Sequence, residues 1–446
     1  MDKFFKVPFA TSGDKTAVPD ATDSNGNVSY TQGYGFDYQR QKTDPAAKNI
    51  ERDKMNAIFN DITKAIGELQ KQGVPDYITS TLNGVTAYSY SINALVRYNN
   101  VLYVSLADAN TALPTDTTKW TPLFGGSQGL FAKTDSSSVM FTKTAAFAVS
   151  TSQAVILAIN GSVKTIASGT VVTMPTATVG TDYAIWAKPD GTLEATANFA
   201  TPPVTGSRKI GGFHYAPGGN ATAQAGGNTT PQINEYSLYD LKFRPACSDP
   251  RGMALIAGGY WMDIYLTGVD AITNGSSKYN VVMADGSSPP KVPTMFGGNG
   301  STTYGSYNWW QAMELATAFG KRCPTQQEFM SAAYGTTEAS SVGTDQNNTI
   351  LNAAYTSKWG IMQATGVLWI WGIERGGPYA GASWNPATGT TASRGSEYNA
   401  PNAVILGGYW GHVSLCGSRS SGWDNAASAS YANIGARFCC DHLQLD

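Results

Sequence analysis

The sequence predicts a multidomain, mainly β protein with one amphipathic helix near its N-terminus and a mixed α+β domain at its C-terminus. The chain has 446 residues, which is more than one ordinary hydrophobic core accommodates. Its 48 glycines fall among Asn- and Ser-rich turns between short apolar runs, a pattern typical of many short strands. Only 14% of the residues are charged and 11% are aromatic, so the chain has enough apolar surface to fold.

The first 73 residues divide into a polar leader and a helix. Residues 1–50 are rich in turn formers, so we expect them to order against a partner or the next segment. Residues 51–73 have the apolar spacing of a helix that ends at Gly73. Alternating steps of three and four join Met55, Ile58, Ile62, Ala65 and Leu69. This spacing fits both a helix packed on its own domain and a short trimeric coiled coil.

Two β segments follow the helix. Residues 74–124 are expected to form a small β module, with a hairpin turn at Asn99-Asn100 and Trp120 in its core. Residues 125–232 are expected to form a β neck domain that ends in a Gly-rich linker, GGNATAQAGGN. Within this domain, Asp190-Gly191 is a second hairpin signal.

Residues 233–446 are predicted to form the α+β domain. Asn308 with Gln311, and Thr325 with Glu328, have the spacing of helix capping boxes. Long, aromatic, Gly-rich segments follow the two helices. Because long loops on a packed scaffold tend to carry function, we expect the functional site in this domain.

Charge and composition exclude several classes of protein. The net charge is −2 and no basic run stands out, which argues against nucleic-acid binding. No apolar run is long enough to span a bilayer, and the N-terminus turns polar too early for a secretory signal, so we expect synthesis in a cytoplasm and no membrane insertion. No fixed-period repeat is evident, which argues against a solenoid.

Cysteine and histidine usage predicts neither a disulfide framework nor a metal site. The cysteines are odd in number and lack CxxC spacing: Cys247, Cys323, Cys416, Cys439 and Cys440. Adjacent Cys439 and Cys440 should point to opposite faces of a strand, so we expect at most one in a core. His214, His412 and His442 lie in different contexts without metal-ligand spacing, so we expect no metal and no cofactor.

The last forty residues have the composition of a display surface. Glycines from Gly407 onward are interleaved with Tyr, Trp, Ser and Asn, the residue types that binding surfaces use. No catalytic constellation occurs in this segment, so we interpret the protein as a binder. Tyr409, His412 and Tyr431 are candidate anchors. Trp410 and Trp423 suit either a hot spot or the core, and their size favours the core.

Several motifs together resemble a known family. They are RPACSDPRGM, GKRCPTQQEFMSAAYG, WIWG, RGSEYNAPNAV and the closing GGYW…GSR…W…NIGARFCCDHL. The C-terminal domain resembles the C-type-lectin-fold domain of phage receptor-binding proteins of the major tropism determinant type, a fold shared with formylglycine-generating enzymes. KVPFATSGDKTAVPD, the helix and TKWTPL resemble the attachment end of tailed-phage tail fibres.

The resemblance implies that the closing block is a variable region rewritten by a diversity-generating retroelement. The implied framework is Gly407, Gly408, Trp410, Gly417, Ser418, Arg419, Trp423, Gly435, Arg437, Asp441 and His442. The implied variable positions are Tyr409, Gly411, His412, Leu415, Gly422, Asp424, Ala429 and Tyr431. Asn425 and Asn433 are either unaltered or framework positions.

The implied function is that of a noncatalytic tail-fibre adhesin in the virion. Its C-terminal domain would bind a protein or glycan receptor on the host bacterium, its N-terminus would attach to the tail or baseplate, and the chain would form a homotrimer. A cellular ligand-binding protein with a diversified lectin domain is a third option beside the adhesin and an enzyme.

Enzymatic alternatives would need particular side chains. A tail enzyme that cleaves surface polysaccharide would need paired carboxylates, for which Glu374, Asp424 and Asp441 are the candidates. Formylglycine-generating chemistry would need a cysteine pair, for which Cys416 and Cys440 are the far-apart candidates in the final block. The EPN, QPD and WND motifs of calcium-dependent animal lectins are absent from the sequence.

Overall fold

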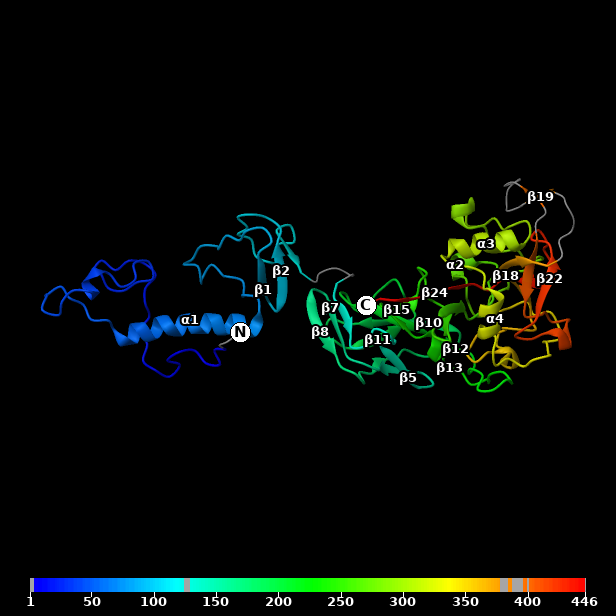
Figure 1. The fold of residues 1–446 in the computed structure, drawn as a ribbon, viewed down its shortest axis with the longest axis horizontal. Coiled ribbons are helices and arrows are strands. Elements are labelled where there is room, and N and C mark those ends of the chain that lie inside the picture. Colours follow the sequence, from blue (N-terminus) through cyan, green and yellow to red (C-terminus); the bar gives the residue numbers. More distant parts are fainter. Residues whose placement is uncertain (1–3, 124–128, 378–383, 387–395, 399–400, 446) are drawn as a thin grey trace. The chain divides into compact units, whose positions relative to one another are not determined.

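The computed structural model describes residues 4–123, 129–377, 384–386, 396–398 and 401–445. The chain folds as two compact units, which comprise residues Met1–Gly125 and Gly126–Asp446 (Figure 1). The described structure is mainly β with few helices.

The first unit is built around helix α1 (Arg52–Gln72), which follows a short 3₁₀ turn, η1 (Phe36–Tyr38). The leader runs along the helix: Phe9 packs edge-on against Phe59 with ring centroids 5.5 Å apart, and the Phe9 amide donates to Thr63 Oγ1 at 2.7 Å. A different stripe of α1 stays uncovered, since the Ile62, Ile66 and Leu69 side chains are 46%, 41% and 53% exposed. The leader therefore orders against the next segment, and it leaves an apolar stripe free.

The same unit contains a three-stranded sheet of order β1-β2-β3, made of β1 (Leu95–Tyr98), β2 (Val101–Ser105) and β3 (Trp120–Pro122). Asn99 and Asn100 have φ of 50° and 63° and join β1 to β2, which confirms the predicted hairpin. Trp120 is buried in a cluster with Tyr77 and Tyr90, and its indole N–H donates to the Ala112 carbonyl at 2.8 Å. The core prediction for Trp120 is confirmed.

The second unit begins with a β region. Its strands are β4 (Phe131–Lys133), β5 (Phe141–Ala145), β6 (Ala148–Thr151), β7 (Val155–Ile159), β8 (Ser162–Ile166), β9 (Val172–Thr173), β10 (Thr181–Ala187), β11 (Leu193–Thr196) and β12 (Arg208–Ala216). β10 and β11 form the hairpin predicted at Asp190-Gly191, where Gly191 has φ +91°. The largest sheet here has the order β13-β12-β10-β11-β9, in which β13 is Gln232–Ile233, and β14 (Tyr239–Asp240) also pairs with β12.

The Gly-rich segment at residues 218–228 does not separate two bodies. β13 (Gln232–Ile233) and β14 (Tyr239–Asp240) both pair with β12, so the sheet continues across residue 232. The Ala221 amide donates to the Ser357 carbonyl at 3.0 Å, and the Gly226 amide donates to the Gly335 carbonyl at 2.8 Å. The expectation of a linker in this segment is therefore wrong. Its glycines instead allow the backbone to pack closely against the C-terminal region.

The C-terminal region combines short helices with two four-stranded sheets. The helical elements are η2 (Glu235–Ser237), α2 (Ala271–Asn274), η3 (Thr294–Phe296), α3 (Trp309–Ala318), α4 (Gln326–Ala332), η4 (Ala353–Tyr355) and η5 (Val413–Leu415). The strands are β15 (Phe243–Pro245), β16 (Met253–Ile256), β17 (Tyr260–Asp263), β18 (Trp369–Gly376), β19 (Trp384–Pro386), β20 (Ser396–Tyr398), β21 (Asn402–Leu406), β22 (Ser421–Asn425), β23 (Ile434–Gly435) and β24 (Cys439–Gln444).

The two sheets have the orders β15-β24-β17-β16 and β22-β21-β18-β23. Helices α3 and α4 lie beside β18 (Figure 1). Both predicted capping boxes are confirmed, at Asn308 with Gln311 and at Thr325 with Glu328. Within the part of the chain that the structure describes, no helix combines the length and apolarity needed to cross a bilayer.

Strand β24 corrects the expectation for the adjacent cysteines. Cys439 belongs to the main core cluster, while Cys440 belongs to a second cluster with Trp261 and Cys247. Both are buried because β24 lies inside its sheet and is covered on both faces. The two side chains do point to opposite faces of β24, as expected. Because both faces of the strand are covered, each side chain is buried in its own cluster.

Candidate binding surface

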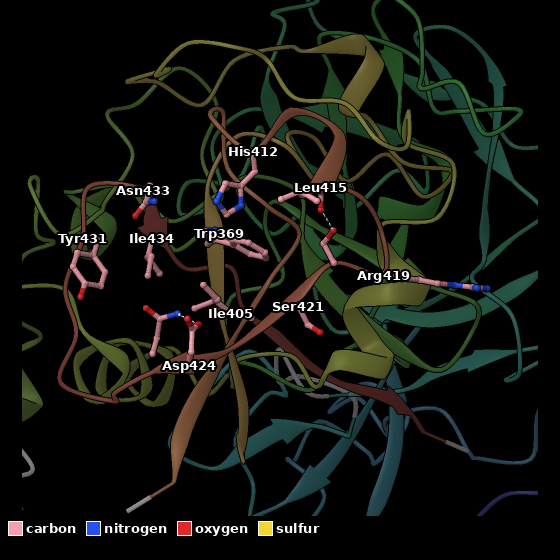
Figure 2. Close-up of a pocket in the computed structure, with 13 residues that line it drawn as sticks. Trp369, Ile405, His412, Leu415, Arg419, Ser421, Asp424, Tyr431, Asn433 and Ile434 are labelled. Carbon is pink, nitrogen blue, oxygen red and sulfur yellow. Dashed lines mark hydrogen bonds between the residues drawn. The ribbon is translucent and has the colours of Figure 1, made fainter. Parts of the chain in front are cut away.

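A hollow of about 780 Å³ lies over the sheet β22-β21-β18-β23 (Figure 2). Its floor is apolar and rigidly held: Trp369 comes from β18, Ile405 from β21 and Ile434 from β23, and all three are buried. The other lining residues are His412, Leu415, Arg419, Ser420, Ser421, Gly422, Asp424, Asn425, Tyr431 and Asn433. The sheet therefore provides a fixed base and, through β22, part of the lining, and the loops around η5 and before β23 provide the rest.

The walls present apolar and aromatic side chains to solvent. Leu415, in η5, is 68% exposed, and Tyr431, in the loop before β23, is 54% exposed. They lie on opposite sides of the hollow (Figure 2). Neither position is needed to cover the core, so a contacting partner would bury area that the isolated chain leaves in water.

His412 supplies a polar atom with unused hydrogen-bonding capacity. Its ring packs edge-on against Trp369 and Tyr409, with centroid distances of 5.5 and 4.3 Å. Its Nδ1 is buried and has no hydrogen-bond partner among the described residues. A buried polar atom without a partner is costly, so the loop that carries His412 keeps an unsatisfied group beside the hollow.

Two charged side chains border the hollow, and they differ in their contacts and direction. Asp424 is exposed, and its carboxylate accepts a hydrogen bond from the Asn425 side-chain amide at 3.1 Å (Figure 2). The exposed Arg419 guanidinium points away from the centre of the hollow (Figure 2). One charge of each sign therefore borders the hollow, which suits a partner with mixed polar groups more than one of uniform charge.

Glycines and a buried thiol hold the loop that carries His412. Gly408 has φ +84°, and a Cβ there would lie 2.4 Å from Cys416 Sγ. The Cys416 thiol donates to the Tyr409 carbonyl at 3.2 Å, and burial raises its pKa to about 11. This thiol therefore stays protonated at neutral pH and fixes the loop.

Arg437 anchors the segment after the hollow. This fully buried side chain donates to four carbonyls, those of Asp263 (2.8 Å), Ile264 (2.6 Å), Met362 (2.6 Å) and Gln363 (3.2 Å). Burial lowers its pKa to about 9, so it remains protonated at neutral pH. One side chain thus joins three chain segments beneath the sheet.

The structure brings five of the ten proposed receptor-contact residues to the hollow: His412, Leu415, Gly422, Asp424 and Tyr431. The half-buried Trp410 and Trp423 pack on the main core cluster, which favours their interpretation as core. Tyr409 and Ala429 pack on another cluster, and Gly411 is exposed beside the Tyr409 ring. Of the proposed anchors, His412 and Tyr431 line the hollow and Tyr409 supports His412.

Sequence reasoning missed the floor and part of the wall. Trp369 and Ile405 come from strands that precede the display segment, and only the WIWG run hinted at the first. Ile434 lies within the display segment but was not singled out. Arg419 was assigned to the framework by resemblance, yet it lines the hollow. Val413 was not singled out, although it is 58% exposed and has φ +43°.

The candidate catalytic groups lie in separate settings. The Glu374 carboxylate accepts a hydrogen bond from the backbone N–H of Gln326 at 2.8 Å. Asp441 forms an ion pair with Arg322 at 3.0 Å, and Asp424 borders the hollow. Cys416 lies beneath the hollow's loop, whereas Cys440 packs with Trp261.

The remaining histidines have structural partners. His214 lies 2.9 Å from both an Asp182 carboxylate oxygen and the Tyr265 hydroxyl, and His442 Nδ1 accepts from the Trp261 indole. Over the described ranges, no group of three or more potential metal ligands occurs.

Comparison with known proteins identifies the family. Residues 139–240 match the family described as the Mtd second domain. The chain is also 50% identical over 328 residues to a "Tail fiber receptor-binding protein" of Bordetella phage BPP-1, an alignment that covers 71% of this chain and 85% of that protein. The chain belongs to this family of phage tail-fibre receptor-binding proteins.

Solved structures agree with this assignment. The M1 variant of the Major Tropism Determinant matches with a TM-score of 0.70 and 45% identity, and the P3c variant with 0.70 and 44%. Each match covers 81% of this chain and 97% of the other. The family resemblance read from the sequence motifs is therefore confirmed, and the C-terminal region is the C-type-lectin-like domain of a tail-fibre receptor-binding protein.

Proposed function

We propose that this protein is the adhesin of a phage tail fibre and that the hollow binds a receptor on the host bacterium. The observation that carries this proposal is the arrangement of the hollow: exposed Leu415 and Tyr431 and the half-buried His412 surround a floor of buried side chains. A rigid base with accessible aromatic and apolar walls is what a receptor contact needs.

The variable positions implied by the resemblance fit the same proposal. His412, Leu415, Gly422, Asp424 and Tyr431 line the hollow, and none of them is fully buried. Framework residues Gly408, Ser418 and Arg437 are buried. Substitution at exposed positions costs little stability, so a retroelement could change receptor choice while the fold persists.

We propose that binding involves no catalysis. Glu374, Asp424 and Asp441 are engaged in different local settings, which gives no carboxylate pair across the hollow. Incubation of the full chain with host surface polysaccharide should release no oligosaccharide. Release would support the tail-enzyme alternative instead.

We propose further that the N-terminal unit attaches the fibre to the tail and that three copies assemble in the virion through α1. The exposed stripe of Ile62, Ile66 and Leu69 has the four-three spacing of a coiled-coil seam and shares Ile62 and Leu69 with the seam predicted from the sequence, whose Met55 and Ile58 are half-buried. Trimerisation would bury this stripe and would turn modest single-site affinity into avidity.

We also propose that the C-terminal fold is of the formylglycine-generating-enzyme type, on the basis of the sequence motifs.

Adsorption measurements test the receptor site. Virions, or the purified protein, would carry His412, Leu415 and Tyr431 changed together to alanine. We expect attachment to host cells to fall at least about tenfold, because buried contacts of this kind each carry about 1 kcal/mol or more. Met295→Ala, at a residue that is 63% exposed and does not line the hollow, is the matched control. Unchanged attachment by a folded triple variant would place the receptor site elsewhere.

Native mass measurement tests the assembly. We expect about three times the 47.2 kDa of one chain. Ile62→Glu with Ile66→Glu should dissociate the trimer, because two charges per chain would enter the seam. Lys64→Glu changes an exposed residue of α1 outside the stripe and should leave the mass unchanged. A monomeric native chain would contradict the proposal.

A further inference from the structure

Two buried thiols face each other where the C-terminal strand meets the first strand of the C-type-lectin-like domain. β15 and β24 are antiparallel, with Pro245 opposite His442. The Ala246 amide donates to the Asp441 carbonyl at 3.0 Å, so the pairing continues beyond β15. The next opposed pair is Cys247 and Cys440, which share one buried cluster.

The strand geometry suits a covalent link. Because Ala246 and Asp441 form a hydrogen-bonded pair, the adjacent Cys247 and Cys440 occupy a non-hydrogen-bonded pair, in which Cα atoms are typically about 4.5 Å apart. Disulfides span Cα separations of roughly 4.4–6.8 Å. The two thiols lie close enough to shift each other's pKa, and both are free in this structure. The Cys247 thiol also donates to the Asp249 carbonyl at 3.2 Å and lies 3.6 Å from Met253 Sδ. The register therefore places the two cysteines opposite each other, at a separation that a disulfide typically spans.

Cys440 is the more acidic of the two thiols. The hydrogen bond from Cys247 lowers the pKa of Cys440, and the charge of Lys321 lowers it further. By contrast, burial raises the pKa of Cys323 and of Cys439, so those thiols are less reactive. The buried Lys321 is itself fixed, with Nζ 2.6 Å from Asp263 Oδ1 and 2.8 Å from Ser276 Oγ.

A small hollow lies beside Lys321, close to this site. A hollow of about 10 Å³, roughly the volume of one water molecule, is lined by Lys321, Ser276 and Phe319. It opens on the lysine whose charge acts on both thiols.

We propose that Cys247 and Cys440 are an oxidation site that forms a disulfide when the protein meets a peroxide. The Cys440 thiolate attacks one peroxide oxygen: an S–O bond forms, the O–O bond breaks, and the leaving hydroxide takes a proton to become water. Cys247 then attacks the sulfur of the Cys440 sulfenic acid. The S–S bond forms, and the hydroxyl leaves with the Cys247 proton as a second water. The thiols are oxidised by two electrons and the peroxide is reduced.

The link would lock the domain without touching the receptor hollow. It would join the chain next to β15, the first strand of the C-type-lectin-like domain, to β24, its last strand. The residues that line the hollow lie between these two strands in the sequence. Closing so long a loop restricts the unfolded chain. A reduced protein made in a cytoplasm would therefore become more stable after release into an oxidising exterior.

Peptide mapping of the full-length protein tests the proposal. The reduced protein would be treated with about one equivalent of hydrogen peroxide, and its free thiols would then be alkylated in denaturant. We expect one linked peptide pair that contains Cys247 and Cys440, a mass loss of two hydrogens, and alkylation of Cys323, Cys416 and Cys439. The oxidised protein should unfold several degrees higher, and dithiothreitol should reverse the shift.

Cys439→Ser is the matched control, because it removes the adjacent buried thiol and should leave the link intact. Cys247→Ser and Cys440→Ser should each abolish the link and the thermal shift. The wild-type map decides the question even if these two variants fold poorly. Five alkylated thiols after peroxide treatment, or a link between any other pair, would overturn the proposal.

Discussion

Residues 409–433 and 434–440 are adjacent in the sequence but differ in burial and in their contacts. The first stretch borders the hollow, with exposed Leu415 and Tyr431. The second stretch is buried throughout, contributes β23 and the start of β24, and contains Arg437. The contrast teaches that tolerance to substitution changes within a few residues, where side chains stop facing solvent and begin to hold the core.

The largest expected effect is a difference in the free energy of unfolding between variants of Arg437, in the buried stretch, and Arg419, in the stretch that borders the hollow. Arg437→Met should lower the free energy of unfolding by about 3–5 kcal/mol, because four carbonyls would lose a charged donor. Arg419→Met, in the hollow wall, should change it by less than about 0.5 kcal/mol. Denaturant unfolding of both variants measures the difference. Equal losses would mean that the boundary is wrongly drawn.

A second comparison lies inside the display loop itself. Gly408→Ala should cost about 2–4 kcal/mol, since its φ of +84° disfavours a side chain and the new Cβ would collide with Cys416 Sγ. Leu415→Ala should cost less than about 0.5 kcal/mol, because Leu415 is exposed. Thermal unfolding distinguishes the two, and a stable Gly408→Ala protein would show that the loop can shift.

Backbone strain gives a smaller effect of opposite sign. Val413 is β-branched and has φ +43°, which is unfavourable for such a residue. Val413→Asn should raise the free energy of unfolding by about 1 kcal/mol, because Asn tolerates this conformation better. Val413→Thr keeps the β-branch and should bring no gain. If both variants behave alike, strain at this residue is not what limits the loop.

The smallest expected effect is a pH dependence outside the hollow. Burial lowers the pKa of His442 below its usual 6.5, and its Nδ1 accepts from the Trp261 indole. The neutral ring is therefore favoured in the folded state, so this contribution to stability is present above pH 6.5 and is lost as the pH falls below it. His442→Gln keeps an acceptor that does not titrate. It should flatten unfolding curves between pH 7 and 5, and an unchanged pH profile would assign the effect to other groups.

Local features of the sequence predicted local structure well. The capping boxes at Asn308 and Thr325 and the hairpin at Asn99-Asn100 depend only on neighbouring residues, and the structure contains all three. The expected linker at 218–228 failed because Gly-rich composition indicates backbone freedom, and close packing uses that freedom as readily as a linker does. The division of the chain into five segments stays a prediction.

The sequence by itself determined the family, the short-strand character and the aromatic, Gly-rich display segment, because motifs and composition are properties of consecutive residues. Only the tertiary structure decided that Trp369 and Ile405 floor the hollow, that Tyr409 supports His412, and that Cys247 faces Cys440. Trp369 and Ile405, like Cys247 and Cys440, come from segments far apart in the sequence, whereas Tyr409 and His412 share one loop. Strand order and register bring the distant segments together, and those depend on how the whole chain buries its apolar surface.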